Sequence, residues 1–314
     1  MMGRKFRTAA VILALLVATA GMALAQAEPQ GEGNVKIVST EWLAQNMDND
    51  NLVILDCQPN VHDYFVQHIP GAVFLNESTL RVPDGSLPAQ YVPADVIERL
   101  LRRVGIDSRD TVVVYTGEGA FTKSGNGLEQ TMMAYTLDRF GHDNVMLLDG
   151  GLEKWMAEGR DTSQKFAENV EQSDYNATVR DYYFVDMDWV KRMKDRDDVI
   201  LLDARPPAVY EGQGPWIKPG HIPGAVSVPW VSFFTDDNHR QLKPMDEIQA
   251  VLDANDITPD KTIICSCGTG REATAEFVLF NNYLGYPNVK IYEGSFTEWS
   301  SYPDNPTVTG TNPY

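Results

Sequence analysis

The chain repeats itself once, and this repeat constrains its fold more than any other feature. Trp42 and Asp56 lie 147 positions before Trp189 and Asp203. The hexapeptide HIPGAV occurs once in each copy, and the closing block FGHDNVMLLDGGLEKW of the first copy becomes LGYPNVKIYEGSFTEW in the second. Three matched blocks in the same order predict two homologous domains.

Each copy alternates short apolar runs with amphipathic segments. The runs LVILD, TVVVY and VMLL of the first copy, and VILLD, TIIC and VKIY of the second, are typical of strands buried on both faces. The segments ADVIERLLRRV and MDEIQAVLDANDI place their apolar residues at helical spacing. This alternation predicts an α/β fold in which helices cover both faces of a parallel sheet. Such sheets bind ligands at the carboxyl ends of their strands.

The domains are expected to span residues 34–160 and 179–305, with a polar linker near 157–178 that has no hydrophobic period. Residues 1–25 combine a basic start, an apolar run and a small-residue cleavage site, as in a secretory signal peptide. An uncleaved membrane anchor is disfavoured, because the run is short and no basic flank follows it. We therefore expect a periplasmic or secreted protein whose mature form has no membrane span.

The chain is acidic, with 44 Asp and Glu against 26 Lys and Arg and a net charge of −18. Removal of the three basic residues of the signal peptide takes this charge to −21. Such a protein is a poor partner for nucleic acid or anionic lipid, so an anionic substrate needs a local positive pocket. We expect neither a metal nor a cofactor, because no zinc-type cluster, dinucleotide motif or phosphate loop stands at a strand-to-helix turn.

The three cysteines, Cys57, Cys265 and Cys267, are too few for a secreted protein stapled by disulfides. Cys267 opens the turn CGTGR, which follows the TIIC strand and precedes a helix. Gly268 and Gly270 allow this turn to bend into a cradle of backbone N–H groups. The cradle and the helix dipole favour a thiolate, which is the nucleophilic form of cysteine. We therefore expect Cys267 to be catalytic.

The paired HIPGAV, the LLDAR strand, the CGTG loop and the closing LGYPNVKIYEGSFTEW together resemble the tandem-domain rhodanese family of sulfurtransferases, of the thiosulfate and 3-mercaptopyruvate type. The resemblance implies two rhodanese-like domains, each a parallel five-stranded sheet flanked by helices. It also implies that sulfur moves from a small anionic donor to cyanide or a thiol through a persulfide on Cys267. A protein sulfur acceptor is left open.

The two copies differ where the chemistry is expected. In place of IICSCGTGREAT the first copy has VVYTGEGAFTKSGNGLEQT, which is longer and has no cysteine. Cys57 aligns with Ala204, and Gln58 stands where the second copy has Arg205. Having lost both nucleophile and cation, the first domain is expected to be an inactive scaffold that forms one wall of the site.

Negative charge on the donor requires cationic partners, and Arg205 and Arg271 are the candidates, since a guanidinium binds an oxyanion or a carboxylate through two hydrogen bonds. Glu272 is unexpected, because a carboxylate repels a dianionic donor unless an arginine neutralises it. Lys218 is a weaker candidate. The expected substrate-binding residues are those of the loop and of two strand ends: Arg205, Trp230, Gly268, Thr269, Gly270, Arg271 and Glu272.

Several polar residues recur in both copies and are therefore assigned structural roles. His68 and His221 are expected to stabilise a turn, and Asp56 and Asp203 to support a loop. Cys265 is interpreted as a buried strand thiol in preference to a thiol that resolves the persulfide. The alternative to an enzyme is a non-catalytic periplasmic carrier that delivers polysulfide or sulfane sulfur to a respiratory partner.

Overall fold

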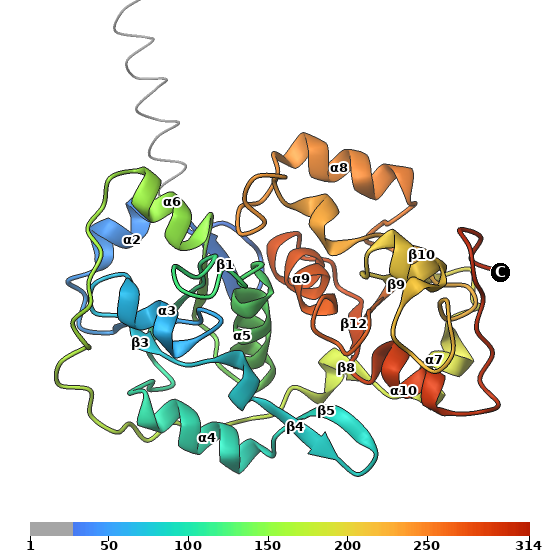
Figure 1. Ribbon diagram of the computed structural model, residues 1–314, viewed down its shortest axis with the longest axis horizontal. Helices are drawn as coiled ribbons and strands as arrows, with labels where there is room; N and C mark the ends of the chain where they lie inside the picture. Colours follow the sequence, from blue (N-terminus) through green and yellow to red (C-terminus); the bar gives the residue numbers. More distant parts are fainter. Residues whose placement is uncertain (1–27) are drawn as a thin grey trace, which may run out of the picture.

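The computed structural model describes residues 28–314, so the expected signal peptide lies outside the described residues (Figure 1). The described chain forms two five-stranded parallel sheets with the same topology. The strand order is β1-β7-β6-β2-β3 in the first sheet and β8-β12-β11-β9-β10, its exact counterpart, in the second. The α/β fold class and the paired sheets expected from the repeat are confirmed.

The strands coincide with the short apolar runs of the sequence. The first sheet contains β1 (Val35–Val38), β2 (Leu52–Asp56), β3 (Val73–Phe74), β6 (Thr111–Tyr115) and β7 (Val145–Leu148). The second contains β8 (Phe184–Val185), β9 (Val199–Asp203), β10 (Val226–Ser227), β11 (Thr262–Ser266) and β12 (Val289–Tyr292). The central strands are buried on both faces, which explains why they do not alternate apolar with polar residues.

Helices cover both sheets. In the first domain these are α2 (Thr40–Asn46), α3 (Val61–Val66), α4 (Ala94–Arg103), α5 (Leu128–Arg139) and α6 (Gly151–Ala157), with a 3-10 turn, η1, at Glu77–Thr79. The second has α7 (Met187–Met193), α8 (Met245–Ala254), α9 (Ala273–Phe277), α10 (Ser295–Ser301), the π-helical segments η3 (Val209–Gln213) and η5 (Val278–Tyr283), and the 3-10 turns η2 (Asp181–Tyr183) and η4 (Trp230–Phe233). Equivalent helices begin in the same way, since Ser39 caps α2 and Asp186 caps α7.

The domains meet through α5 and α9, which lie side by side between the two sheets (Figure 1). Every residue of α5 is buried, as expected of a helix packed on all sides. Thr131 of α5 and Thr274 of α9 share a hydrogen bond of 3.1 Å. Arg139, at the end of α5, pairs with Glu293 of the second domain at 2.6 Å. The helix α9, which follows the loop that begins at Cys267, is therefore packed directly against the first domain.

Two further segments of the first domain set the position of the site. The hairpin of β4 (Arg81–Asp84) and β5 (Leu87–Tyr91) extends from the first domain toward the second (Figure 1). Between α6 and η2 the chain has no helix or strand, apart from an isolated bridge between His68 and Ser163. Within the described residues no helix is long and apolar enough to cross a bilayer.

Candidate active site

The loop that carries Cys267 lies at the carboxyl end of β11 and leads into α9. The first turn of α10 is hydrogen-bonded to this loop. The carbonyl of Cys267 accepts a hydrogen bond from the amide of Phe296 at 3.0 Å, and the carbonyl of Gly268 accepts one from the amide of Thr297 at 2.9 Å. Two backbone hydrogen bonds thus fix the position of Cys267 and Gly268 relative to α10.

The Ser295 side chain contacts both the backbone and the sulfur of Cys267. Its hydroxyl accepts a hydrogen bond from the Cys267 amide at 3.1 Å, donates to the Tyr292 carbonyl at 2.7 Å, and lies 3.9 Å from Sγ. The φ of Ser295 is +50°, whereas the matching position in the first domain is Gly151 at +58°. A left-handed serine costs about 1 kcal/mol or more, so this strain is offset by the contacts of its hydroxyl.

The expected cradle of amides is present around the sulfur. The backbone N–H groups of Thr269 and Ala273 both donate hydrogen bonds to the Cys267 sulfur. Gly270 has a φ of +79°, and a Cβ at this position would lie 2.8 Å from the Glu293 carbonyl oxygen. Glycine is therefore required at this position for the loop to pack against the backbone of Glu293.

The expected thiolate is not favoured in this closed loop. Cys267 is fully buried, and burial raises the pKa of its thiol well above the usual value. The Glu272 carboxylate raises that pKa further, by its charge and by accepting a hydrogen bond from the thiol. The amides of Thr269 and Ala273 act in the opposite direction, but more weakly. The glycines that shape the loop are visible in the sequence, whereas the burial of the sulfur and the effect of the Glu272 carboxylate are not.

Arg205 lies beside the loop at the end of β9. Its side chain is 1% exposed and pairs with Asp203 through Nε at 2.8 Å and Nη2 at 2.6 Å. Nη2 also donates to the Gly220 carbonyl, while Nη1 is buried and has no partner among the described residues. The guanidinium carbon stacks 4.2 Å from the ring centre of Phe296. The Nη1 group of this buried guanidinium is therefore left to donate hydrogen bonds to an anion.

Trp216 is a site residue that the sequence argument did not select. It lies in the segment EGQGPWIKPG, and its ring packs so closely on the loop that a Cβ on Gly268 would lie 2.7 Å from it. The indole N–H donates to Thr297 at 2.7 Å, and the ring centre lies 5.0 Å from the Arg205 guanidinium carbon. Gly268 is therefore needed to admit Trp216 over the loop. The insert in the second copy was the available signal.

Arg271 does not face Cys267 but the first domain. Its Nε donates to Glu77 at 2.5 Å, and its Nη2 donates to Glu129 at 2.9 Å. Thr269 is held from the same side, since Nη1 of Arg81 donates to its carbonyl at 2.5 Å. The first domain therefore holds the Cys267 loop at two points, and the charge of Arg271 is already paired.

A cavity of about 430 Å³ lies at the domain boundary next to Arg271. Its lining comes from both domains: Pro59, Asn60, Val61, Phe74, Asn76, Glu77, Ser78, Glu129 and Arg271. Cys267 is fully buried and does not line this cavity. The first domain thus forms one wall of the region beside the loop.

Two other residues expected to bind the substrate, Trp230 and Lys218, are engaged in contacts within the fold. Trp230 is buried in the core, with its ring centre 5.4 Å from that of Phe234. The ammonium group of Lys218 donates to the carbonyls of Tyr302, Pro303 and Asn305, and so ties the insert to the end of α10. Neither residue has a contact with Cys267 that would assign it to the substrate.

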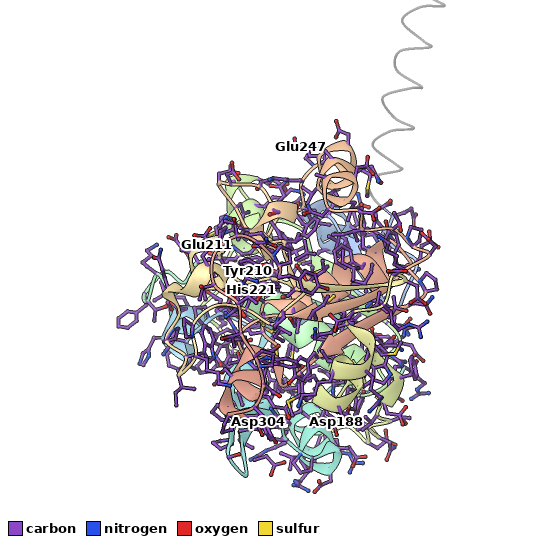
Figure 2. The ribbon with its side chains drawn as sticks, turned by 90° about the vertical axis from the view of Figure 1, so that its right-hand side faces the viewer. Asp188, Tyr210, Glu211, His221, Glu247 and Asp304 are labelled. Atoms are coloured by element: carbon purple, nitrogen blue, oxygen red, sulfur yellow. The ribbon has the colours of Figure 1, made fainter. Side chains whose placement is uncertain are left out.

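The paired histidines fix the backbone of each domain. The two ring nitrogens of His221 lie 3.0 Å from the Tyr210 carbonyl and 3.2 Å from the Asn312 carbonyl, and its ring stacks on that of Tyr210 (Figure 2). His68 has the same arrangement with the carbonyls of Tyr64 and Lys165. These contacts agree with the structural role expected from their recurrence in both copies.

The other two cysteines are buried and, like Cys267, form no disulfide. Cys57 follows β2 in the core of the first domain, where burial raises the pKa of its thiol well above the usual value. Cys265 lies inside β11, and burial raises its thiol pKa in the same way. Neither environment resembles the amide cradle of Cys267. Among the described residues no group of His, Cys, Asp and Glu is arranged to hold a metal ion.

Comparison with known proteins decides the family. The sequence profile of the Rhodanese-like domain matches the chain twice, at residues 39–158 and 186–302. The chain belongs to the rhodanese family. A putative thiosulfate sulfurtransferase of Synechococcus elongatus is 34% identical, over 96% of this chain and 93% of that protein. The mitochondrial thiosulfate/3-mercaptopyruvate sulfurtransferase 1 of Arabidopsis thaliana is 32% identical, over 86% of this chain and 77% of that protein.

The fold of this rhodanese matches solved structures of the family. The crystal structure of the 3-mercaptopyruvate sulfurtransferase SseA from Escherichia coli superimposes with a TM-score of 0.72 at 28% identity, covering 83% of this chain and 98% of SseA. Both the rhodanese resemblance and the sulfurtransferase class expected from the sequence are confirmed by these comparisons. Donor, acceptor and the persulfide on Cys267 are not specified by them.

Proposed function

We propose that this rhodanese transfers a sulfane sulfur from a small anionic donor to a thiophilic acceptor through a persulfide on Cys267. The donor is thiosulfate or 3-mercaptopyruvate, the substrates named in its relatives. The acceptor is cyanide or a thiol. The reaction has two displacements: Cys267 first takes the outer sulfur of the donor, and the acceptor then takes that sulfur from the persulfide.

The observation that carries this proposal is the cradle around Sγ. Two amides, of Thr269 and Ala273, are directed at the Cys267 sulfur, and the Ser295 hydroxyl lies 3.9 Å from it. Fixed donors of this kind stabilise negative charge that develops in a buried site, without a cost of reorientation during the reaction. A persulfide anion carries its charge on the terminal sulfur, which is bonded to Sγ and therefore lies close to these donors. The first domain offers no cysteine in the equivalent loop.

Arg205 is the residue assigned to the anionic end of the donor. The Arg205 side chain passes beside Gly268, since a Cβ on that glycine would lie 3.9 Å from its Cδ, and its Nη1 is buried with no partner among the described residues. A buried guanidinium attracts a sulfonate or carboxylate strongly because little water competes with it. Arg271, whose charge is paired with Glu77 and Glu129, is assigned to holding the loop instead.

The test is a panel of donors and acceptors assayed with purified protein. We expect many turnovers per chain and ping-pong kinetics, with thiosulfate or 3-mercaptopyruvate as donor. A carrier that serves a respiratory partner would take up one sulfur per chain and stop. Stoichiometric loading without turnover on every donor and acceptor would therefore replace the enzyme with the carrier.

We also propose that residues 1–25 direct export to the periplasm and are then removed. The basic start, the apolar run and the small-residue site support this proposal. Expression of the full chain in a bacterium, followed by fractionation and N-terminal sequencing, tests it. Mature protein beginning near residue 26 in the periplasmic fraction is expected, and an intact N-terminus in the cytoplasm would contradict export.

A further inference from the structure

The segment that carries Trp216 occurs in the second domain alone. In both domains a tyrosine ring stacks on the histidine of HIPGAV. The histidine follows the tyrosine by 4 positions in the first domain but by 11 in the second, where the two are Tyr210 and His221 (Figure 2). The domain that carries Cys267 therefore has seven additional residues at this point, and the domain without a loop cysteine lacks them.

Few contacts hold the tip of this segment, which we define as residues 215–217. Among the described residues no backbone hydrogen bond involves the tip. On one side the chain is anchored by the ammonium group of Lys218, and on the other Gly212 has a φ of +126°, which favours glycine. Ile217 is 88% exposed, whereas the Trp216 side chain is partly buried. The indole is therefore the main attachment of the tip to the rest of the domain.

This indole lies over the loop of Cys267 and over the guanidinium of Arg205. Its N–H donates to the Thr297 hydroxyl at 2.7 Å, and that hydroxyl donates to the Gly268 carbonyl at 2.8 Å. A Cβ on Gly268 would lie 2.7 Å from the indole ring, and the guanidinium carbon of Arg205 lies 5.0 Å from the ring centre. One hydroxyl thus connects the tip to the residue that follows Cys267.

The proposed reaction requires a donor to reach two groups that the structure encloses. Cys267 is 0% exposed, and Nη1 of Arg205 is buried without a partner among the described residues. The loop itself is firmly held, since its backbone is bonded to α10 and the first domain holds it through Arg81 and Arg271. The tip has fewer attachments than the loop it covers, so its displacement costs less free energy.

We propose that Trp216 controls entry to the sulfur-transfer site. The tip moves away to uncover Arg205 and the loop of Cys267 for the donor, and it returns to exclude water while the sulfur is held. Exclusion of solvent protects a reactive intermediate from side reactions, and a persulfide is such an intermediate. This inference rests on the proposed sulfur-transfer function and names the residue that admits its substrates.

The experiment measures how fast iodoacetamide, a small uncharged reagent, alkylates each cysteine of the purified protein at one alkaline pH. Peptide mass spectrometry distinguishes the three thiols. Cys57 and Cys265 are buried in the first and second domains, so their alkylation reports unfolding of either domain. Alkylation of Cys267 reports both unfolding and displacement of the tip. In wild type we therefore expect Cys267 to react slowly, but faster than the other two.

Two variants displace the tip in different ways. Trp216→Phe keeps a ring over the loop but loses the N–H, so Cys267 should react about fivefold faster, the usual effect of losing one hydrogen bond. Gly214→Ala leaves the tip sequence unchanged. Its φ of −88° suits alanine, but its Cβ would lie 2.6 Å from the Trp216 ring and displaces it. This variant should speed alkylation of Cys267 about tenfold.

Trp189→Phe is the matched control. Trp189 is also partly buried in the second domain and packs against the same apolar cluster as Trp216, but no hydrogen bond of its indole is formed with any described residue. Alkylation of Cys267 in this variant should match wild type. An acceleration equal to that of Trp216→Phe would show a general effect of losing a tryptophan and would overturn the inference.

The pattern over the three thiols decides the outcome. Faster alkylation confined to Cys267 in Trp216→Phe and Gly214→Ala supports the inference. If neither variant changes the rate at Cys267, or if Cys265 accelerates by the same factor, Trp216 only stabilises the domain and the inference is overturned. Either result leaves the proposed function standing, because alkylation requires no sulfur transfer. If wild type forms no persulfide with any donor, the proposed function fails, and the alkylation rates still decide whether the tip controls access to the thiol.

Discussion

At the carboxyl edge of the first sheet, Asp56 accepts hydrogen bonds from Gln58 and from the Tyr115 hydroxyl, whereas at the matching edge of the second sheet Asp203 pairs with Arg205. Tyr115 and Ser266 occupy the same register opposite these aspartates. The buried tyrosine therefore fills, in the first domain, the space beside the aspartate where the second domain keeps a cation. The same sheet topology thus carries an aspartate with neutral partners in the first domain and an aspartate paired with a cation in the second.

The loops that follow the central strands, β6 in the first domain and β11 in the second, also differ in what holds them. In the first domain the longer loop is tied down by Asp63, which accepts hydrogen bonds from the amides of Phe121 and Thr122. In the second domain the loop bends around Cys267, and Arg271 ties it to the first domain. The first domain therefore has no cysteine in this loop, and its Glu77 and Glu129 hold the corresponding loop of the second domain through Arg271.

The largest expected effect is on sulfur-transfer turnover, and it should differ between a thiol of the second domain and one of the first. Cys267→Ser should lower sulfur-transfer turnover at least about 1,000-fold, because a hydroxyl is a far weaker nucleophile than a thiolate. Cys57→Ser, the control in the first domain, should retain turnover close to wild type. Steady-state assays of both variants measure this, and a comparable loss in Cys57→Ser would end the division between an active and a supporting domain.

The second prediction concerns a variant in which the carboxyl edge of the second sheet is given the residue type found in the first. Arg205→Gln copies the pairing of Gln58 with Asp56, so the second domain should still fold. It should lower kcat/KM for anionic donors about 100-fold, because the buried cation that stabilises donor charge is gone. Arg196→Gln removes an exposed cation from the same domain and should leave kcat/KM unchanged. Equal kinetics in the two variants would remove Arg205 from the site.

The third prediction concerns the tie between the domains. Arg271→Ala leaves Glu77 and Glu129 without their cation and should lower the free energy of unfolding by about 3 kcal/mol. The control Arg99→Ala breaks an exposed pair with Asp95 and should cost less than about 0.5 kcal/mol. Chemical denaturation measures both. If Arg271→Ala keeps full stability and instead raises KM for thiosulfate, Arg271 binds the donor as the sequence suggested.

The smallest effect is a pH dependence in the first domain. Burial raises the pKa of Asp56 to about 6, so the folded state favours its neutral form. The stabilisation from this group is present below about pH 4 and is lost as pH rises through about 6, a change on the order of 2 kcal/mol. Asp56→Asn lacks this group. The free energy of unfolding of wild type, relative to Asp56→Asn, should therefore fall between pH 4 and pH 7; an unchanged difference would contradict the assignment.

The repeat and the glycine-flanked cysteine were sufficient to predict the paired sheets and the place of Cys267, because both depend on local patterns. The partners of Arg271 could not be predicted, since they lie 194 and 142 residues away in the other domain. The raised thiol pKa was also missed, because it depends on burial and on where the Glu272 side chain points. Ser295 had a visible signal: the closing block reads GG in the first copy and GS in the second.

The central claim is that sulfur is carried on Cys267 of the second domain and nowhere else. The most direct measurement is mass spectrometry of the protein after exposure to donor and removal of the excess, with digestion to locate the added sulfur. We expect one added sulfur atom in wild type, on the peptide that contains Cys267, lost on addition of cyanide, and none in Cys267→Ser. Sulfur found on Cys57 or Cys265, or turnover with no sulfur on the protein, would contradict the account.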